Sequence, residues 1–356
     1  MPLEETRVAA PASGSSVSAR IIAAGIVIAF CYWASSVLVT LLVAVLMAYF
    51  LDPVVTWLEY FRVPRALGSL FVLIVTLALL TVLAWALVDR IDQFGQDWPQ
   101  FRAPLQSVAA AVQKKLDIFE ARVSELEPQP SRPGPSVIRV AESHTLRDAI
   151  VSRLGSLYSF IVAAAFIPFL IFFMLAAKRQ VWHATMQLFP ATQRTQVKQT
   201  LADVTHVLRS YVIGTALVGL ILVLASWLFF WWIGLDFAFL IALVSGLLNL
   251  VPYIGVVMAW IPPLLVGLRQ FHTAPPFIGI FVVLLVLHLV AANLLVPALV
   301  GWRIRLNALA LTVSLLFWGF LWGAMGLILA IPVTAVIKVI CDHVESWQPV
   351  GRWLSA

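Results

Sequence analysis

Long apolar runs alternate with shorter polar stretches along this chain. A helix needs about 20 apolar residues to cross the hydrocarbon core of a bilayer. The pattern therefore predicts an all-α polytopic membrane protein with six to eight transmembrane helices. The predicted apolar segments are Ile21–Leu51 (two short spans with a turn near Ala34–Ser36), Ala66–Val88, Leu154–Ala177, Tyr211–Ile233, Phe237–Leu268, Phe277–Val300 and Asn307–Lys338.

Two polar segments interrupt these runs. Residues 89–153 mix charged residues with apolar residues at helical spacing and contain a proline-rich stretch, which predicts one external, periplasmic helical insertion. Residues 178–210 predict a cytoplasmic amphipathic segment. The predicted organisation is an N-terminal tail at 1–20, three spans in 21–88, the insertion at 89–153, a transport core at 154–340 and a C-terminal tail at 341–356.

Lysine and arginine set the expected orientation, because they collect in loops that face the cytoplasm. Their distribution places both termini in the cytoplasm. If 237–268 and 307–338 both cross fully, the chain has eight spans, and Arg303 and Arg305 face outward. If both are re-entrant hairpins, six full spans remain and these arginines face the cytoplasm, as the charge rule prefers. We expect a hairpin for 237–268 and leave 307–338 open.

The segment NLVPYIG, Asn249–Gly255, interrupts an apolar run. Pro252 lacks an amide hydrogen and Gly255 permits unusual backbone angles, so a helix is expected to break here. Transporters build substrate sites at such breaks, and Asn249 and Tyr253 offer polar groups for a substrate; the alternative is a plain packing kink. The other residues expected to interrupt helices are Pro262, Pro297, Gly323, Gly326 and Pro332.

Three further polar residues are candidates for the site. Asn293 opens NLLVPALVG, a faint repeat of the Asn–Pro–Gly pattern that chance explains equally well, and it is a substrate-binding candidate. His288 lies in mid-span and can carry a proton, although a neutral histidine sharing one hydrogen bond is an equal alternative. Asp52, before Pro53, is expected to end the second span and cap a turn at the interface, and is a second proton-coupling candidate.

Composition narrows the class further. Hydrophobic residues make up 62% and charged residues 11% of the chain, against about 25% charged in soluble domains, so the lipid bilayer is the expected surroundings. The net charge of +6 is assigned to cytoplasmic loops rather than to nucleic-acid binding. Two cysteines without metal-ligand spacing, and no catalytic or phosphate-binding motif, predict no metal, no cofactor and no enzyme.

Four blocks carry a family resemblance: Ala48–Gly68, Ser210–Leu222, GLLNLVPYIGVVMAWIPPLL at Gly246–Leu265, and Asn293–Ile340 with W-G-x-x-G-x-x-L-A-x-P at Trp322–Pro332. Together they resemble the autoinducer-2 exporter family of permeases. The resemblance implies a multi-pass protein of the bacterial inner membrane that forms homo-oligomers. It also implies export of a small polar solute, with the quorum-sensing autoinducer as the named substrate. Some relatives are instead proposed to exchange sodium or lithium for protons.

Several positions depart from the family pattern. An acidic residue is usual at Asn249, and a Gln/Glu set is usual where Leu289 and Ala291 stand; proline is usual at Val256 and Ala308. Losing the carboxylates disfavours cation antiport, so we expect export of a neutral polar solute by alternating access, with optional proton coupling. A Na⁺(Li⁺)/H⁺ antiporter and a non-transporting scaffold remain the alternatives.

Overall fold

The computed structural model describes residues 17–85, 87–88, 113, 165–249, 251, 254–300 and 306–355. Every regular element in these ranges is helical, which confirms the all-α prediction. Five helices are long and apolar enough to cross a membrane, or six if one bent pair counts as a span. The insertion predicted for 89–153 lies outside the described ranges, apart from residue 113.

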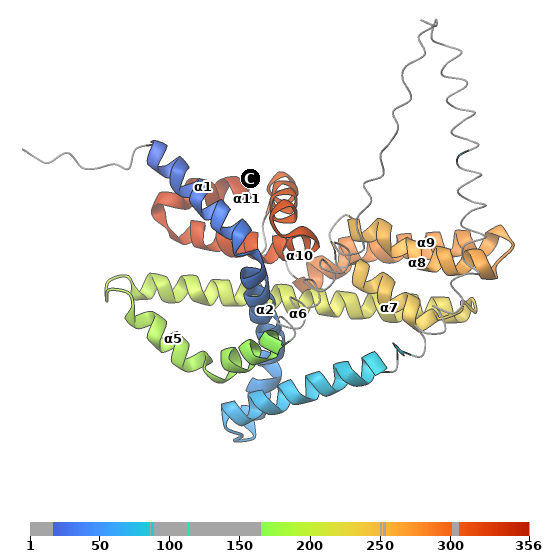
Figure 1. The fold of residues 1–356 in the computed structure, drawn as a ribbon, viewed down its shortest axis with the longest axis horizontal. Helices are drawn as coiled ribbons and strands as arrows, with labels where there is room; N and C mark the ends of the chain where they lie inside the picture. The colour runs from blue at the N-terminus through green and yellow to red at the C-terminus, as the bar shows by residue number, and fades with distance from the viewer. Residues whose placement is uncertain are drawn as a thin grey trace, which may run out of the picture.

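The chain begins with α1 (Val17–Trp33) and α2 (Ser35–Tyr60), which meet at Ala34. The amide of Ala34 donates to the carbonyl of Phe30 at 2.8 Å, as it would inside a helix. Figure 1 shows the two helices following one another. The junction is therefore a kink, and the chain reversal expected here does not occur.

The second helix runs further than expected. α2 continues through Pro53 and ends at Tyr60, rather than ending at Asp52. Prolines are tolerated in membrane helices where neighbouring groups compensate for the lost hydrogen bond. The next helix, Arg65–Trp85, packs with α2 and with the helix Ala165–Ala176 around buried aliphatic side chains.

The central polar segment divides between two helices. Helix Ala165–Ala176 bends by 71° into α5 (Lys178–Gln187). After a short loop, α6 runs unbroken over Arg194–Trp232, so the second half of the expected amphipathic segment and the fifth span form one helix. This helix of 39 residues is the longest element described, and it contacts α2, α7, α9 and α10.

A helical hairpin follows, formed by α7 (Ala238–Leu248) and α8 (Ile254–Gln270). At its open end, the amide of Asp236 donates to the side chain of Gln270 at 2.9 Å, and Arg269 pairs with Asp236. The ends of the two helices therefore lie together, with the Asn249 break at the opposite tip. This fold-back is the geometry of the re-entrant hairpin expected for 237–268.

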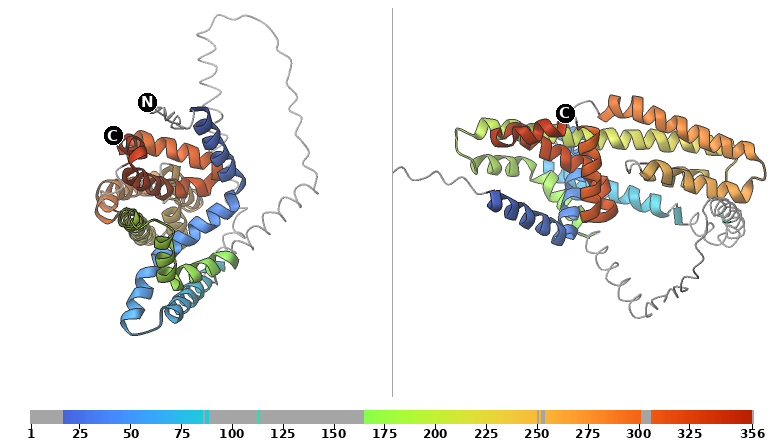
Figure 2. Two further views of the ribbon diagram at one scale, coloured as in Figure 1. Left: turned by 90° about the vertical axis from the view of Figure 1, so that its left-hand side faces the viewer. Right: turned by 90° about the horizontal axis from the view of Figure 1, so that it is seen from above.

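The next span consists of α9 (Ala274–Val290) and the π-helix η1 (Ala291–Val300). The right-hand view of Figure 2 shows this span running beside α6. The approach is close at Gly214, where a β-carbon would lie 2.6 Å from the carbonyl oxygen of Leu299. Glycine is required here because any side chain would push α6 and η1 apart.

A second hairpin is formed within α10 (Ala308–His343). Its backbone leaves the helical region at Gly323, where φ is +61°, a value that favours glycine. The hydroxyl of Thr334 donates to that of Ser314 at 3.0 Å, so the two limbs lie side by side. Length and composition alone would count this element as one span; the fold-back makes it a hairpin.

The chain end holds the second hairpin at its base. After the 3₁₀ turn η2 (Glu345–Trp347), the helix α11 (Gln348–Ser355) returns to the start of α10. The amide of Asn307 donates to the carbonyl of Leu354 at 2.9 Å, and its side chain donates to the carbonyl of Trp353 at 2.7 Å. Both ends of α10 thus lie on one side, which answers the question left open for 307–338 in favour of a hairpin.

Candidate functional site

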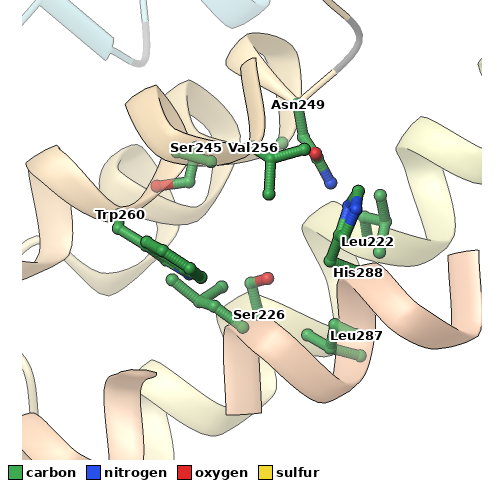
Figure 3. A pocket seen from close by; sticks show the side chains of 11 residues that line it. Leu222, Ser226, Ser245, Asn249, Val256, Trp260, Leu287 and His288 are labelled. Atoms are coloured by element: carbon green, nitrogen blue, oxygen red, sulfur yellow. The ribbon is translucent and has the colours of Figure 1, made fainter. Parts of the chain in front are cut away.

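A small polar cavity lies where the tip half of the α7–α8 hairpin meets α6 and α9 (Figure 3). Its volume is about 20 Å³, which is room for about one water molecule. Four polar side chains line it, from α6, from α7 and its C-terminal end, and from α9: Ser226, Ser245, Asn249 and His288. The structure thus brings together two residues that the sequence singled out, Asn249 and His288.

Close helix packing positions the serines. A β-carbon on Gly246 would lie 2.2 Å from Cγ2 of Val223, so glycine lets α7 approach α6. Ser245, the neighbour of Gly246, and Ser226 on α6 are thereby buried beside the cavity, with exposed fractions of 2% and 3%.

The hydroxyl of Ser245 has an unusual environment. Its oxygen is buried and has no hydrogen-bond partner among the described residues. A buried polar group without a partner costs about 1–3 kcal/mol, and native proteins keep few of them. The site is polar, so a water molecule or a solute hydroxyl could satisfy such a group.

Asn249 and His288 face the cavity from two different helices, α7 and α9. Asn249 is the C-terminal cap of α7, and its backbone N–H donates to the backbone carbonyl of Ser245 at 3.0 Å, which leaves the side-chain amide free to face the cavity. His288 lies in the last turn of α9, just before the π-helix η1. Figure 3 shows the Asn249 amide and the His288 ring turned toward the same space. An amide and an imidazole together offer both donors and acceptors to a solute.

Other predicted site residues lie elsewhere. Asn293 is exposed on η1, and its side chain donates to the carbonyl of Leu289 at 2.8 Å, so it does not line the cavity. Pro252 and Tyr253 fall outside the described residues. Gly255, the second residue of α8, lies so near the end of α7 that a β-carbon would be 2.0 Å from the carbonyl oxygen of Leu248.

Of the remaining residues expected to interrupt helices, Gly323 alone marks a change of direction among the described residues. Gly323 forms the turn of α10, and Gly326 packs where a β-carbon would meet the Trp318 carbonyl at 1.8 Å. The prolines differ from expectation, because helices run through all three: Pro262 in α8, Pro297 in η1 and Pro332 in α10. Packing against neighbouring helices compensates for the missing proline hydrogen bonds.

Asp52 is not the interfacial cap that we expected. It is only 4% exposed, and it accepts from Arg65 at 2.6 Å and from Lys178 at 2.7 Å. Arg65 also reaches Glu59 at 2.9 Å and the Leu175 carbonyl at 2.7 Å. This ion-pair network ties α2 to the helices that follow it. Lys178 is 126 positions away in the sequence, so no local pattern pointed to this partner.

Sequence reasoning missed Ser226 and Ser245. Both are hydroxyl residues inside apolar runs, and that contrast was a usable signal because a polar side chain at membrane depth needs a partner. None of the described residues that line the cavity carries a carboxylate. The described part of the chain also contains no cluster of histidine, cysteine or acidic residues that could hold a metal ion.

Comparison with known proteins agrees with this architecture. The sequence model that describes the family 'AI-2E family transporter' matches residues 21–346 of this chain. The AI-2 transport protein TqsA of Escherichia coli is 27% identical over 334 residues, which cover 91% of this chain and 90% of TqsA. PerM of Escherichia coli, provisionally named a permease, is 28% identical over 342 residues, covering 93% and 92% of the two chains.

A third relative, YrrI of Bacillus subtilis, provisionally named a transport protein, is 27% identical over 326 residues, covering 86% of each chain. These relatives are named for transport and permeation rather than for catalysis. The match to the family model spans nearly the whole chain, including both hairpins and the residues that line the cavity. The chain therefore belongs to the AI-2E family of membrane transporters.

Proposed function

We propose that this transporter exports a small neutral polar solute, and that the cavity between α6, α9 and the α7–α8 hairpin is its binding site. The observation that carries the proposal is the convergence of Ser226, Ser245, Asn249 and His288 on one cavity beside a broken helix. Autoinducer-2 is the first solute to test, because the relative TqsA is named for it.

The chemistry of the cavity favours a neutral solute over a metal cation. Hard cations such as sodium are held mainly by carboxylate and carbonyl oxygens. The described lining offers two hydroxyls, one amide and one imidazole among aliphatic side chains and the indole of Trp260, and no carboxylate. Such groups suit a solute with several hydroxyl groups, since each can donate or accept a hydrogen bond.

The size of the cavity supports alternating access. A volume of about 20 Å³ admits a water molecule but no larger solute, so the hairpin must move away from α6 or α9 for a solute to bind. The connection from α6 to α7 contains two residues with positive φ, Gly234 at +69° and Phe237 at +55°. A short connection with unusual backbone angles is a natural hinge for the hairpin.

His288 is the proposed proton carrier, because it is the one ionisable side chain among the described residues that line the cavity. A proton on His288 and a solute in the same cavity would then move across the membrane in coupled steps. The proposed setting is the bacterial inner membrane, with both termini in the cytoplasm as the lysines and arginines indicate. We further propose that the protein forms a homo-oligomer, as the family resemblance implies.

The test is transport by the purified protein in liposomes. Labelled autoinducer-2 is offered with and without a pH gradient, and with a sodium gradient as a control. Two variants are compared: Asn249→Ala, which alters the cavity, and Asn293→Ala, which alters an exposed asparagine outside it. We expect gradient-driven movement in the wild type and in Asn293→Ala, and at least a tenfold loss in Asn249→Ala, roughly the cost of one buried hydrogen bond.

Other outcomes point elsewhere. Proton flux that answers sodium or lithium, without solute movement, would favour the antiporter. Equal transport by both variants would remove the cavity from the proposal. No flux of any kind would favour the scaffold reading, in which the external insertion 89–153 binds a partner. In the active protein, unchanged pH dependence of His288→Gln would reject His288 as the proton carrier.

A further inference from the structure

Two larger cavities lie where α6 meets the C-terminal limb of α10. They share no lining residue with the proposed solute site. One has a volume of about 190 Å³ and the other about 740 Å³. His343, at the end of α10, lines both of them. Its side chain is one-quarter exposed, so water and protons can reach it.

Both ring nitrogens of His343 face hydrogen-bond acceptors. Nδ1 lies 2.9 Å from the backbone carbonyl oxygen of Val339, and Nε2 lies 3.2 Å from Oδ2 of Asp203 on α6. A carbonyl and an ionised carboxylate only accept hydrogen bonds, whereas a neutral imidazole carries one N–H. Both bonds can therefore form at once only when the ring is protonated.

Charged and titratable groups of both signs face the His343 ring. The ring lies in the last turn of α10, where the helix dipole stabilises a cation. Asp203 attracts it directly, and Glu345 on η2 adds negative charge to the larger cavity. Two basic residues also line the smaller cavity beside His343. Lys338 is paired with Asp342 at 2.5 Å, and His206 lies on α6.

The protonated ring joins two separate elements. Asp203 belongs to α6, whereas Val339 and His343 belong to the α10 hairpin. The side chain of Gln196, also on α6, donates to the backbone carbonyl of His343, so the contact surface between the helices includes this residue. Losing the proton would remove the positive charge of the ring and one of its two hydrogen bonds, since a neutral imidazole carries a single N–H.

We propose that His343 and Asp203 form a proton-binding site that controls the contact between α6 and the α10 hairpin. Protonation of His343 fastens the end of the hairpin to α6. As the pH rises and the proton leaves, the ring keeps one N–H and no charge, so its contact with Asp203 weakens and the end of the hairpin is held less firmly to α6. The site lies apart from the solute cavity, so it does not depend on the solute or on the role of His288.

Hydrogen–deuterium exchange of the full-length protein in lipid nanodiscs tests this proposal. Peptides covering residues 338–355 are followed at pH 6 and pH 8. The chemical rate of exchange itself changes with pH, so the wild type is compared with His343→Gln at each pH and the ratio is reported. We expect the variant to exchange roughly two- to fivefold faster at pH 6, the effect of a partly exposed ion pair, and at the wild-type rate at pH 8.

His206→Gln is the matched control, because it removes the other histidine of the same cavity. It should keep the pH-dependent protection of the wild type, whereas Asp203→Asn should lose it as His343→Gln does. A wild-type to His343→Gln ratio that is the same at both pH values would overturn the proposal. Loss of pH dependence in His206→Gln alone would assign the titration to that residue and equally overturn it.

Discussion

The indole nitrogen of Trp318 donates to the hydroxyl of Thr334 at 3.2 Å, across 16 positions of sequence. The same hydroxyl donates onward to Ser314 at 3.0 Å, and all three side chains are buried. These bonds connect the two limbs of α10 and hold them together beyond the turn at Gly323. The segment is therefore a hairpin with a polar cross-link inside an otherwise apolar interface.

Replacing Thr334 by valine keeps the shape of the side chain and removes this cross-link. The Trp318 N–H would then be buried without its acceptor, so we expect a loss of about 1–3 kcal/mol of stability. Thr312→Val is the control, because the Thr312 hydroxyl bonds only its own helix at 2.8 Å and is exposed. Thermal unfolding in nanodiscs should separate the two variants, and equal midpoints would show that the cross-link does not stabilise the hairpin.

The hairpin fixes the topology of the C-terminal half. Leu309 at the start of α10 and Val350 on α11 are 63% and 50% exposed, and the Asn307 contacts place them on the same side. After replacement of Cys31 and Cys341, single cysteines at these two positions should react with an impermeant thiol reagent from the same face of the membrane. Labelling from opposite faces would mean that α10 crosses the bilayer.

The tip of the α7–α8 hairpin has no room for a side chain at Gly255. Adding a methyl group would force it against the carbonyl of Leu248, so we expect Gly255→Ala to cost about 1–3 kcal/mol and to reduce transport while membrane insertion persists. Gly25→Ala is the control, because nothing lies within 4 Å of its added β-carbon. Full transport by Gly255→Ala would show that the tip tolerates rearrangement.

Asp52 is expected to matter for stability rather than for proton movement. Asp52→Asn leaves the largely buried Arg65 and the 40% exposed Lys178 with a neutral partner, which should cost about 3 kcal/mol, mainly through Arg65. Arg179→Gln, which removes a 76% exposed partner from Glu59, should cost less than about 1 kcal/mol. Unfolding of the two variants checks this. A stable Asp52→Asn protein with altered pH dependence of transport would restore the proton-coupling role.

The sequence predicted the features that depend on local chemistry. The proline and glycine after Asn249 identified the first hairpin, and depth in the membrane singled out His288. The fold of 307–338 stayed open because hydropathy is the same whether a helix crosses or turns back. The positive φ at Gly323, the bond between Ser314 and Thr334 and the contacts of Asn307 with α11 distinguish the two.

Local sequence patterns could not predict the interactions between segments that are far apart in the chain. Asp52 was expected at an interface because the proline after it suggested a helix end, and its partner Lys178 comes from another helix. Asn293 resembled Asn249 in sequence, yet helical geometry turns its side chain onto the carbonyl of Leu289. The convergence of Ser226, Ser245 and His288 likewise depends on how three elements pack.

The most direct test of the proposed solute site is protection of Ser245→Cys from a small membrane-permeant thiol reagent. The experiment uses protein without Cys31 and Cys341, under transporting conditions, and adds increasing autoinducer-2. We predict that movement of the hairpin lets the thiol react, and that the solute slows the reaction at the concentrations that saturate transport. A thiol that never reacts while transport proceeds, or that reacts at the same rate at saturating solute, would contradict the assignment of this cavity as the solute site.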